Sequence, residues 1–155
     1  MNNELISEAI SNLQLLTIKL HKSILDRQDD FIEGESPEYF AFQYMRNVGV
    51  ATLEAEDDEN NKIKILRVFP KFGVRAIQKQ NNKKKPKDIK VLFKIEATFR
   101  ADYQIKLPLS DAAIREFAKY NAIYNVWAFW RQHVFDMTAR AGLPDVNIPL
   151  FSAQK

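Results

Sequence analysis

The sequence NVWAFWRQHVFDMTARAGLP, from Asn125 to Pro144, has the length of one long helix, and Gly142 followed by Pro144 is a usual helix stop. At about 100° per residue, the main apolar face of this helix carries Val126, Trp127, Trp130, Val134, Met137 and Ala141. Phe129 and Phe135 fall on two other sides. Because a surface helix needs only one apolar stripe, this helix must be buried more than once. A sheet can cover one face, and the others call for a second chain or a ligand.

Seven residues of the same helix also follow a known family pattern, and they are Asn125, Val126, Trp130, Arg131, Met137, Arg140 and Pro144. In type and order they resemble the long helix of the SecB export-chaperone family. Phe129 stands where many members of that family have proline. Upstream, residues 96–105, EATFRADYQI, are similar to the family's last strand. The resemblance covers the last third of the chain, and it extends to the first two thirds only in the layout of elements.

Hydrophobic periodicity divides the rest of the chain into strands and short helices. Helical spacing predicts a helix over residues 3–12, and Ser110 with Asp111 predicts the start of another, which Asn121 ends before the long helix. Alternation predicts strands over residues 16–24, 38–54, 62–78 and 88–106. Pro70 predicts a bulge or an edge in the third strand, because proline cannot donate a ladder hydrogen bond.

These elements predict the α+β class and a single domain over residues 1–155. The expected architecture is a four-stranded antiparallel sheet with one long C-terminal helix, preceded by a short helix, packed on one face. A loop over residues 28–37 is expected to expose Phe31 and Ile32. After Pro144 we expect an extended apolar tail. Many SecB relatives have a second helix there, for which residues 145–155 leave no room.

The sequence carries no recognisable catalytic chemistry. It lacks glycine-rich nucleotide motifs, the HExxH and GxSxG motifs, and any cysteine. Of its two histidines, His21 is expected at the surface and His133 in helix packing, and the acidic turn at 54–61 lacks the ligand spacing of a calcium loop. We therefore expect no enzyme activity, no cofactor and no metal. The absence of cysteine and of a secretory signal favours a cytoplasmic protein, and no apolar run reaches the roughly 18 residues needed for membrane insertion.

Charge is strongly segregated along the chain, although the net charge is only +3. Residues 1–61 hold 4 basic and 13 acidic side chains, whereas residues 62–106 hold 14 basic and 3 acidic ones. One interpretation is that neighbouring strands pair acids with bases across the sheet. The alternative function is nucleic-acid binding by the basic face of residues 62–106. Aromatic residues fall on the buried phase of those strands, which argues against a stacking platform for bases.

The resemblance implies an ATP-independent holdase chaperone that binds unfolded client polypeptides as a homotetramer, a dimer of dimers. Its clients would be exported preproteins or one dedicated client such as an antitoxin. The groove for clients would be lined by Phe31, Phe40, Phe42, Trp127, Phe129 and Phe151. Subunit contacts would involve Ile95, Ala97, Phe99, Trp130, Val134 and Met137.

One departure from the family concerns the export motor SecA, which typical members dock through acidic side chains on the outer sheet face. Here the third and fourth strands carry basic residues instead, and these are Arg67, Lys71, Arg75, Lys90, Lys94 and Arg100. This difference argues against SecA docking and favours a specialised branch of the family.

Overall fold

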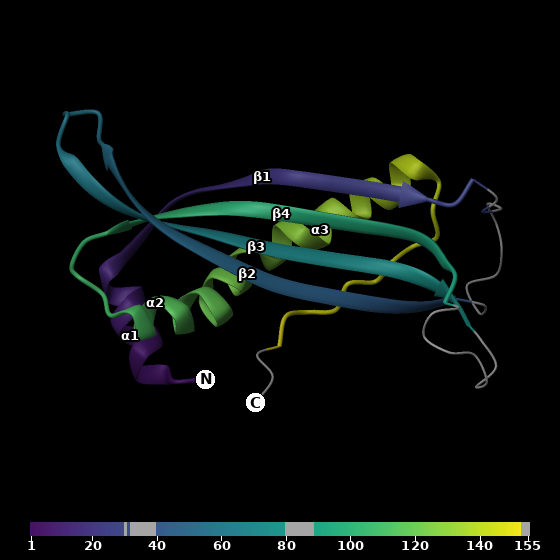
Figure 1. Cartoon of the computed structure of the whole chain (residues 1–155), viewed down its shortest axis with the longest axis horizontal. Coiled ribbons are helices and arrows are strands. Elements are labelled where there is room, and N and C mark those ends of the chain that lie inside the picture. The colour runs from purple at the N-terminus through teal and green to yellow at the C-terminus, as the bar shows by residue number, and fades with distance from the viewer. Residues whose placement is uncertain (30, 32–39, 80–88, 153–155) are drawn as a thin grey trace.

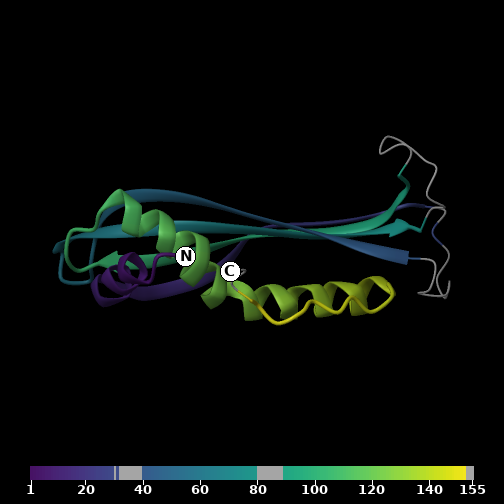
Figure 2. The same cartoon turned by 90° about the horizontal axis from the view of Figure 1, so that it is seen from below.

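The computed structural model describes residues 1–29, 31, 40–79 and 89–152. Its elements are α1 (Asn3–Asn12), β1 (Leu13–Arg27), β2 (Phe40–Glu56), β3 (Lys62–Gln78), β4 (Val91–Ile105), α2 (Asp111–Phe117), a π-helical turn (Ala118–Ala122) and α3 (Ile123–Ala141). The strands form one antiparallel sheet in the order β1-β4-β3-β2. The helices lie against one face of this sheet, and we call the opposite face the outer face (Figure 1, Figure 2). The predicted α+β architecture is confirmed.

The core lies between α3 and the two central strands. Phe72 and Val74 of β3 pair with Ala97 and Ile95 of β4, and cross-strand partners point to the same face of a sheet. The ring of Phe72 stacks on Trp130 of α3, with 5.6 Å between ring centroids. All of these side chains are buried. Because each large apolar side chain contributes about 1.5–3 kcal/mol when fully buried, this layer fixes α3 to the sheet.

A hydrogen bond fixes the first turns of α3 against β4. The Asn125 side-chain amide donates from Nδ2 to the Tyr103 hydroxyl at 3.1 Å. Burial raises the pKa of Tyr103 above its ordinary value of 10.0, and the bond from Asn125 opposes that rise, so the hydroxyl is neutral at physiological pH. The asparagine of the family-like pattern therefore has a packing role in this chain.

The short helices begin as the sequence predicts. Asn2 caps α1 by accepting from the backbone N–H groups of Glu4 and Leu5, and Ser110 caps α2 by accepting from that of Ala113. Ala9 of α1 is buried in the main core. These caps satisfy backbone donors that a helix start leaves without partners.

The structure corrects two predicted interruptions. Asn121 does not end the helix, because the π-helical turn joins α2 to α3 without a break in helical conformation. Pro70 lies in a central strand, opposite Val48 of β2, and it produces neither an edge nor a bulge. Pairing between β3 and β4 is instead interrupted beside Pro70 with no change of register. β3 has its predicted bounds, whereas β1 is longer than predicted and carries two register shifts.

Candidate functional site

α3 ends at its predicted stop, and the chain then turns back along the helix. Gly142 has a φ of 61°, in the left-handed region that glycine adopts most easily. The Leu143 N–H donates to the carbonyl of Thr138 at 3.0 Å, which closes the last turn. Arg27 of β1 donates to the carbonyl of Ala141 at 2.8 Å and so ties the helix end to the sheet. Residues 143–152, which we call the tail, then run beside α3 towards its start (Figure 2).

Two side chains of α3 hold the tail by its backbone. Trp127 donates from its indole nitrogen to the carbonyl of Pro149 at 2.8 Å. Arg131 donates from Nε to the carbonyl of Ile148 at 3.1 Å. Trp127 and Arg131 are four residues apart and therefore share one side of the helix. Both bonds go to carbonyl groups, which any residue of an extended chain would offer.

The Phe151 ring lies between α3 and β2. Its centroid is 5.4 Å from that of Trp127 and 6.1 Å from that of Tyr124, both on α3. The guanidinium of Arg46, on β2, lies over the same ring at 5.4 Å. Arg46 interrupts the apolar phase of its strand in the sequence, and this cation–π contact accounts for it. The charged residue in an apolar phase was a visible signal in the sequence, but its partner Phe151 was not.

A second aromatic cluster lies at the other end of the tail. Phe31 is 5.9 Å from Phe40 and 5.8 Å from Phe93 between ring centroids. Both Phe31 and Phe40 are buried, and Leu143 of the tail is buried in the same cluster. The prediction that Phe31 is exposed on a loop is therefore wrong, because the ring packs onto β2 and β4. Ile32 lies outside the described residues.

The six predicted groove residues fall into three places. Phe31, Phe40 and the half-buried Phe42 belong to the cluster around Phe93. Trp127 and Phe151 contact each other across the helix and tail. Phe129 is exposed and lies about 160° around α3 from Trp127, so it faces away from the tail. Their assignment to client binding stays a prediction.

The six predicted interface residues also have clear positions. Five of them are buried within this chain's own core, and they are Ile95, Ala97, Phe99, Trp130 and Val134. Met137 is half-buried against the same core. Their part in subunit contacts stays a prediction, since each could act there only through the backbone or through neighbouring side chains.

Large apolar side chains remain exposed on α3 and on β1. On α3 these are Phe135 and Tyr124, each 64% exposed, and Phe129, 48% exposed. On β1 they are Leu15, Leu16, Leu20 and Ile24. β1 is an edge strand of 15 residues, and within the described part of the chain no strand lies beside its other edge. Exposed apolar surface next to a long sheet edge is typical of an interaction site.

His133 joins α3 to β1 within this region. Its Nε2 is 2.9 Å from the hydroxyl of Ser23, and its ring lies 6.1 Å from that of Phe99 between centroids. Burial lowers the pKa of His133, and the nearby Asp136 carboxylate opposes this effect. The ring is therefore neutral at pH 7, as expected for a histidine that packs on a helix face.

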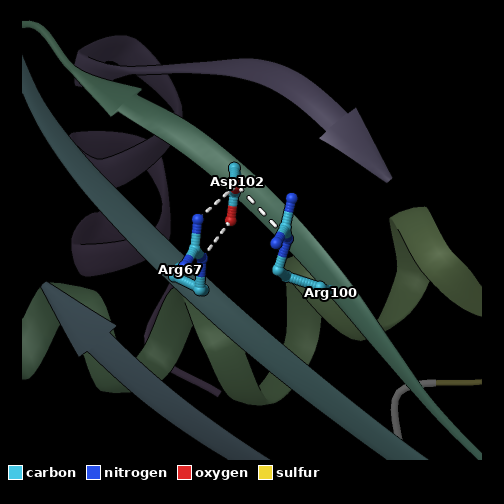
Figure 3. A network of polar contacts seen from close by, with 3 residues as sticks. All are labelled: Arg67, Arg100 and Asp102. Atoms are coloured by element: carbon cyan, nitrogen blue, oxygen red, sulfur yellow. Dashed lines mark hydrogen bonds and ion pairs between the residues drawn. The ribbon is translucent and has the colours of Figure 1, made fainter. Parts of the chain in front are cut away.

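The outer face of the sheet carries a network of ionic contacts (Figure 3). Asp102 is only 6% exposed and accepts two hydrogen bonds from Arg67, from Nε at 2.8 Å and from Nη2 at 3.0 Å. Arg100 approaches the same carboxylate at 3.5 Å. The hydrogen bond from Arg67 to Asp102 raises the pKa of Arg67, so this guanidinium stays charged. Lys71 forms a further ion pair with Glu96 at 3.4 Å.

A hollow of about 500 Å³ also crosses the sheet, and its lining includes Gly73. The charged side chains around it are three cations and two carboxylates. They are Arg27, Arg75, Lys94, Asp26 and Glu96. Arg75 donates to the side chain of Gln43 at 2.7 Å. This mixture of charges selects no particular ligand.

The described residues contain no group of three or more metal-ligating side chains of histidine, cysteine, aspartate or glutamate. None of the described helices is long and apolar enough to cross a membrane.

Comparisons with known proteins agree with this geometry at the level of the fold. No family model matches the sequence, and no curated protein matches it either. Among solved structures, the chain is similar to the Mycobacterium tuberculosis Rv1957 SecB-like chaperone in complex with a ChAD peptide from the Rv1956 HigA1 antitoxin. The TM-score is 0.67 at 16% sequence identity, over 98% of this chain and 99% of that one. The chain thus has a SecB-like fold.

A second solved structure is similar at a lower level. It is a protein of unknown function from Streptococcus agalactiae, with a TM-score of 0.47 and 12% identity, over 89% of this chain and 97% of that one.

Proposed function

We propose that this protein is an ATP-independent holdase chaperone that binds unfolded polypeptides as a homotetramer. The observation that carries the proposal is the apolar surface that remains on α3 and β1 after the sheet has packed against the helix. Phe135 and Tyr124 are each 64% exposed, so most of their apolar surface is not buried by this chain's own core. Surfaces of this kind bind polypeptide, whether it belongs to a second copy or to a client.

The two exposed regions support two kinds of subunit contact. The edge of β1 offers a row of backbone donors and acceptors that a second β1 could extend into a continuous sheet. The exposed phenylalanines of α3 offer an apolar surface for joining two such dimers. Together they support a dimer of dimers, with the α3 helices between the sheets.

Two features support polypeptide clients. α3 already binds an extended segment, the tail, through backbone carbonyl groups. The solved SecB-like chaperone of the same fold is in complex with an antitoxin peptide. An extended client segment is therefore the ligand class that fits best, either an exported preprotein or one dedicated client. Such a chaperone would act in the cytoplasm and need no cofactor.

The test combines mass and holding activity. Light scattering of the purified chain should give about 72 kDa, four times the 18.0 kDa of one chain. A chemically denatured protein that aggregates on dilution should stay soluble when the chain is present and nucleotide is absent. A monomer of 18.0 kDa that leaves aggregation unchanged would refute the proposal.

Nucleic-acid binding remains the alternative, favoured by the basic residues of β3 and β4. Part of this charge is already paired, because Arg67 and Lys71 contact Asp102 and Glu96. The lysine-rich turn over residues 83–87 lies outside the described residues. Binding of a single-stranded DNA that weakens steeply with salt, and that is lost on neutralising residues 83–85, would support the alternative.

A further inference from the structure

We infer that the tail occupies the client site of its own chain as a substitute client, so that a client must displace residues 149–152 to bind. This inference rests on the proposed function and specifies which segment of a client the site accepts. It also makes the tail a built-in competitor that lowers the affinity for weak clients.

The backbone contacts show why the tail resembles a client. Trp127 and Arg131 bind two successive carbonyl groups, those of Pro149 and Ile148. Neither bond depends on the side chain of the residue it holds. An extended segment of another protein could accept the bond from Trp127 in place of Pro149, which matches a binder of low sequence specificity.

The side-chain contacts define two subsites along the tail. Ile148 is buried to 3% exposure in the main core, whereas Leu150 is 77% exposed. Phe151 fills the space between Trp127, Tyr124 and Arg46. Because Ile148 stays in place, the part of the site that a client enters accepts an aromatic residue two positions after the residue whose carbonyl binds Trp127, in an extended chain. The residue just before the aromatic one faces solvent and is free to vary.

The last part of the tail can leave without disturbing the fold. Residues 149–152 have no regular secondary structure, so their release breaks no ladder or helical hydrogen bonds. Pro149, Leu150 and Phe151 follow the buried Ile148, which can stay in place as an anchor. Segments with few buried apolar contacts open at the lowest free-energy cost, and this segment meets that description.

The matched variants are Phe151→Ala and Leu150→Ala in the full chain. Removing the Phe151 ring weakens the competitor, and the binding-competent fraction of molecules rises. We expect Phe151→Ala to bind a permanently unfolded protein, such as reduced and carboxymethylated α-lactalbumin, roughly tenfold more tightly than the wild type. Leu150→Ala should bind it like the wild type, since that side chain faces solvent. Unchanged or weaker binding by Phe151→Ala would overturn the inference.

Displacement can be observed directly by fluorine NMR of protein labelled with 5-fluorotryptophan. The chain has two tryptophans, and a Trp127→Phe variant assigns the two resonances. Saturating client should move the Trp127 resonance away from its wild-type position, because a different segment then contacts the indole ring. The Trp130 resonance should stay unchanged and serves as an internal control, because Trp130 is buried between α3 and the sheet. A client that binds without moving the Trp127 resonance would show that the tail stays in place, and would overturn the inference.

The two proposals fail in different ways. If the chain suppresses aggregation but Phe151→Ala and the wild type bind client equally, the holdase function stands and the competing tail is refuted. If no variant binds client, the proposed function fails first. A synthetic peptide of residues 143–152, added to Phe151→Ala, should compete with bound client. If it does not compete, the client binds outside the site that the tail occupies, and the competing tail is refuted.

Discussion

Replacing Phe135 with glutamine tests whether the exposed side of α3 is a subunit interface. The side chain is 64% exposed, which leaves about 130 Å² of a phenylalanine's surface available for burial. At about 25 cal/mol per Å², complete burial of that area would contribute about 3 kcal/mol. A two-fold axis would place Phe135 twice in each interface. The substitution would therefore lower the free energy of association by at most about 6 kcal/mol. This loss is large enough to separate a tetramer into dimers at micromolar concentration.

The assay is light scattering coupled to size exclusion. We expect a mass of about 72 kDa for the wild type and about 36 kDa for Phe135→Gln, from a chain mass of 18.0 kDa. Far-ultraviolet circular dichroism should be the same for both, because Phe135 faces solvent in the single chain. Arg140→Gln is the matched control, since it places the same residue at another exposed position of α3. A Phe135→Gln protein that keeps the wild-type mass would refute the assignment of this surface.

Three further substitutions test the structure by denaturation. Asp102→Asn leaves Arg67 and Arg100 without their shared carboxylate and should lower the free energy of unfolding by about 2 kcal/mol, and a urea midpoint like that of the wild type would contradict this. Because burial lowers the pKa of His133 below 6.5, the unfolded chain binds the proton first, so stability is complete above about pH 6.5 and falls below it. His133→Gln should flatten this decline in urea titrations, and equal pH dependence would contradict the account. Gly142→Ala places a side chain at a φ of 61° and should cost about 1 kcal/mol in thermal unfolding, and an unchanged melting temperature would count against it.

Much of the fold could be predicted from local sequence patterns, because strand alternation and helix caps depend on residues close together in the chain. The alternation in β3 gave its bounds, and Ser110 and Gly142 marked a helix start and a helix end. The three apolar directions of the long helix were visible from spacing alone. Phe129 and Phe135 are indeed exposed on sides of α3 that the sheet does not cover.

Long-range partners could not be predicted in the same way. Phe31 lies within an acidic segment of the sequence, and only the fold places it against Phe40 and Phe93. Asn121 has low helix propensity, but the continuous packing of the π-helical turn outweighs it. The sequence of the tail predicts an extended apolar segment. No residue near Trp127 in the sequence indicates that its indole would donate to a carbonyl group of this tail.

Part of the charge segregation of the sequence becomes charge pairing in the sheet, and this bears on the two candidate functions. The register sets Glu54 of β2 opposite Lys64 of β3, and Asp26 of β1 opposite Lys94 of β4. Phosphate binding is favoured by cations that exchange counterions for phosphates, and acids placed opposite these bases weaken that gain. The apolar residues of α3 have no such internal compensation, since Phe135 remains exposed. Because several of the described charges lie opposite a partner of the other sign and the exposed apolar side chains of α3 do not, the described residues support the proposed polypeptide ligand better than a nucleic acid.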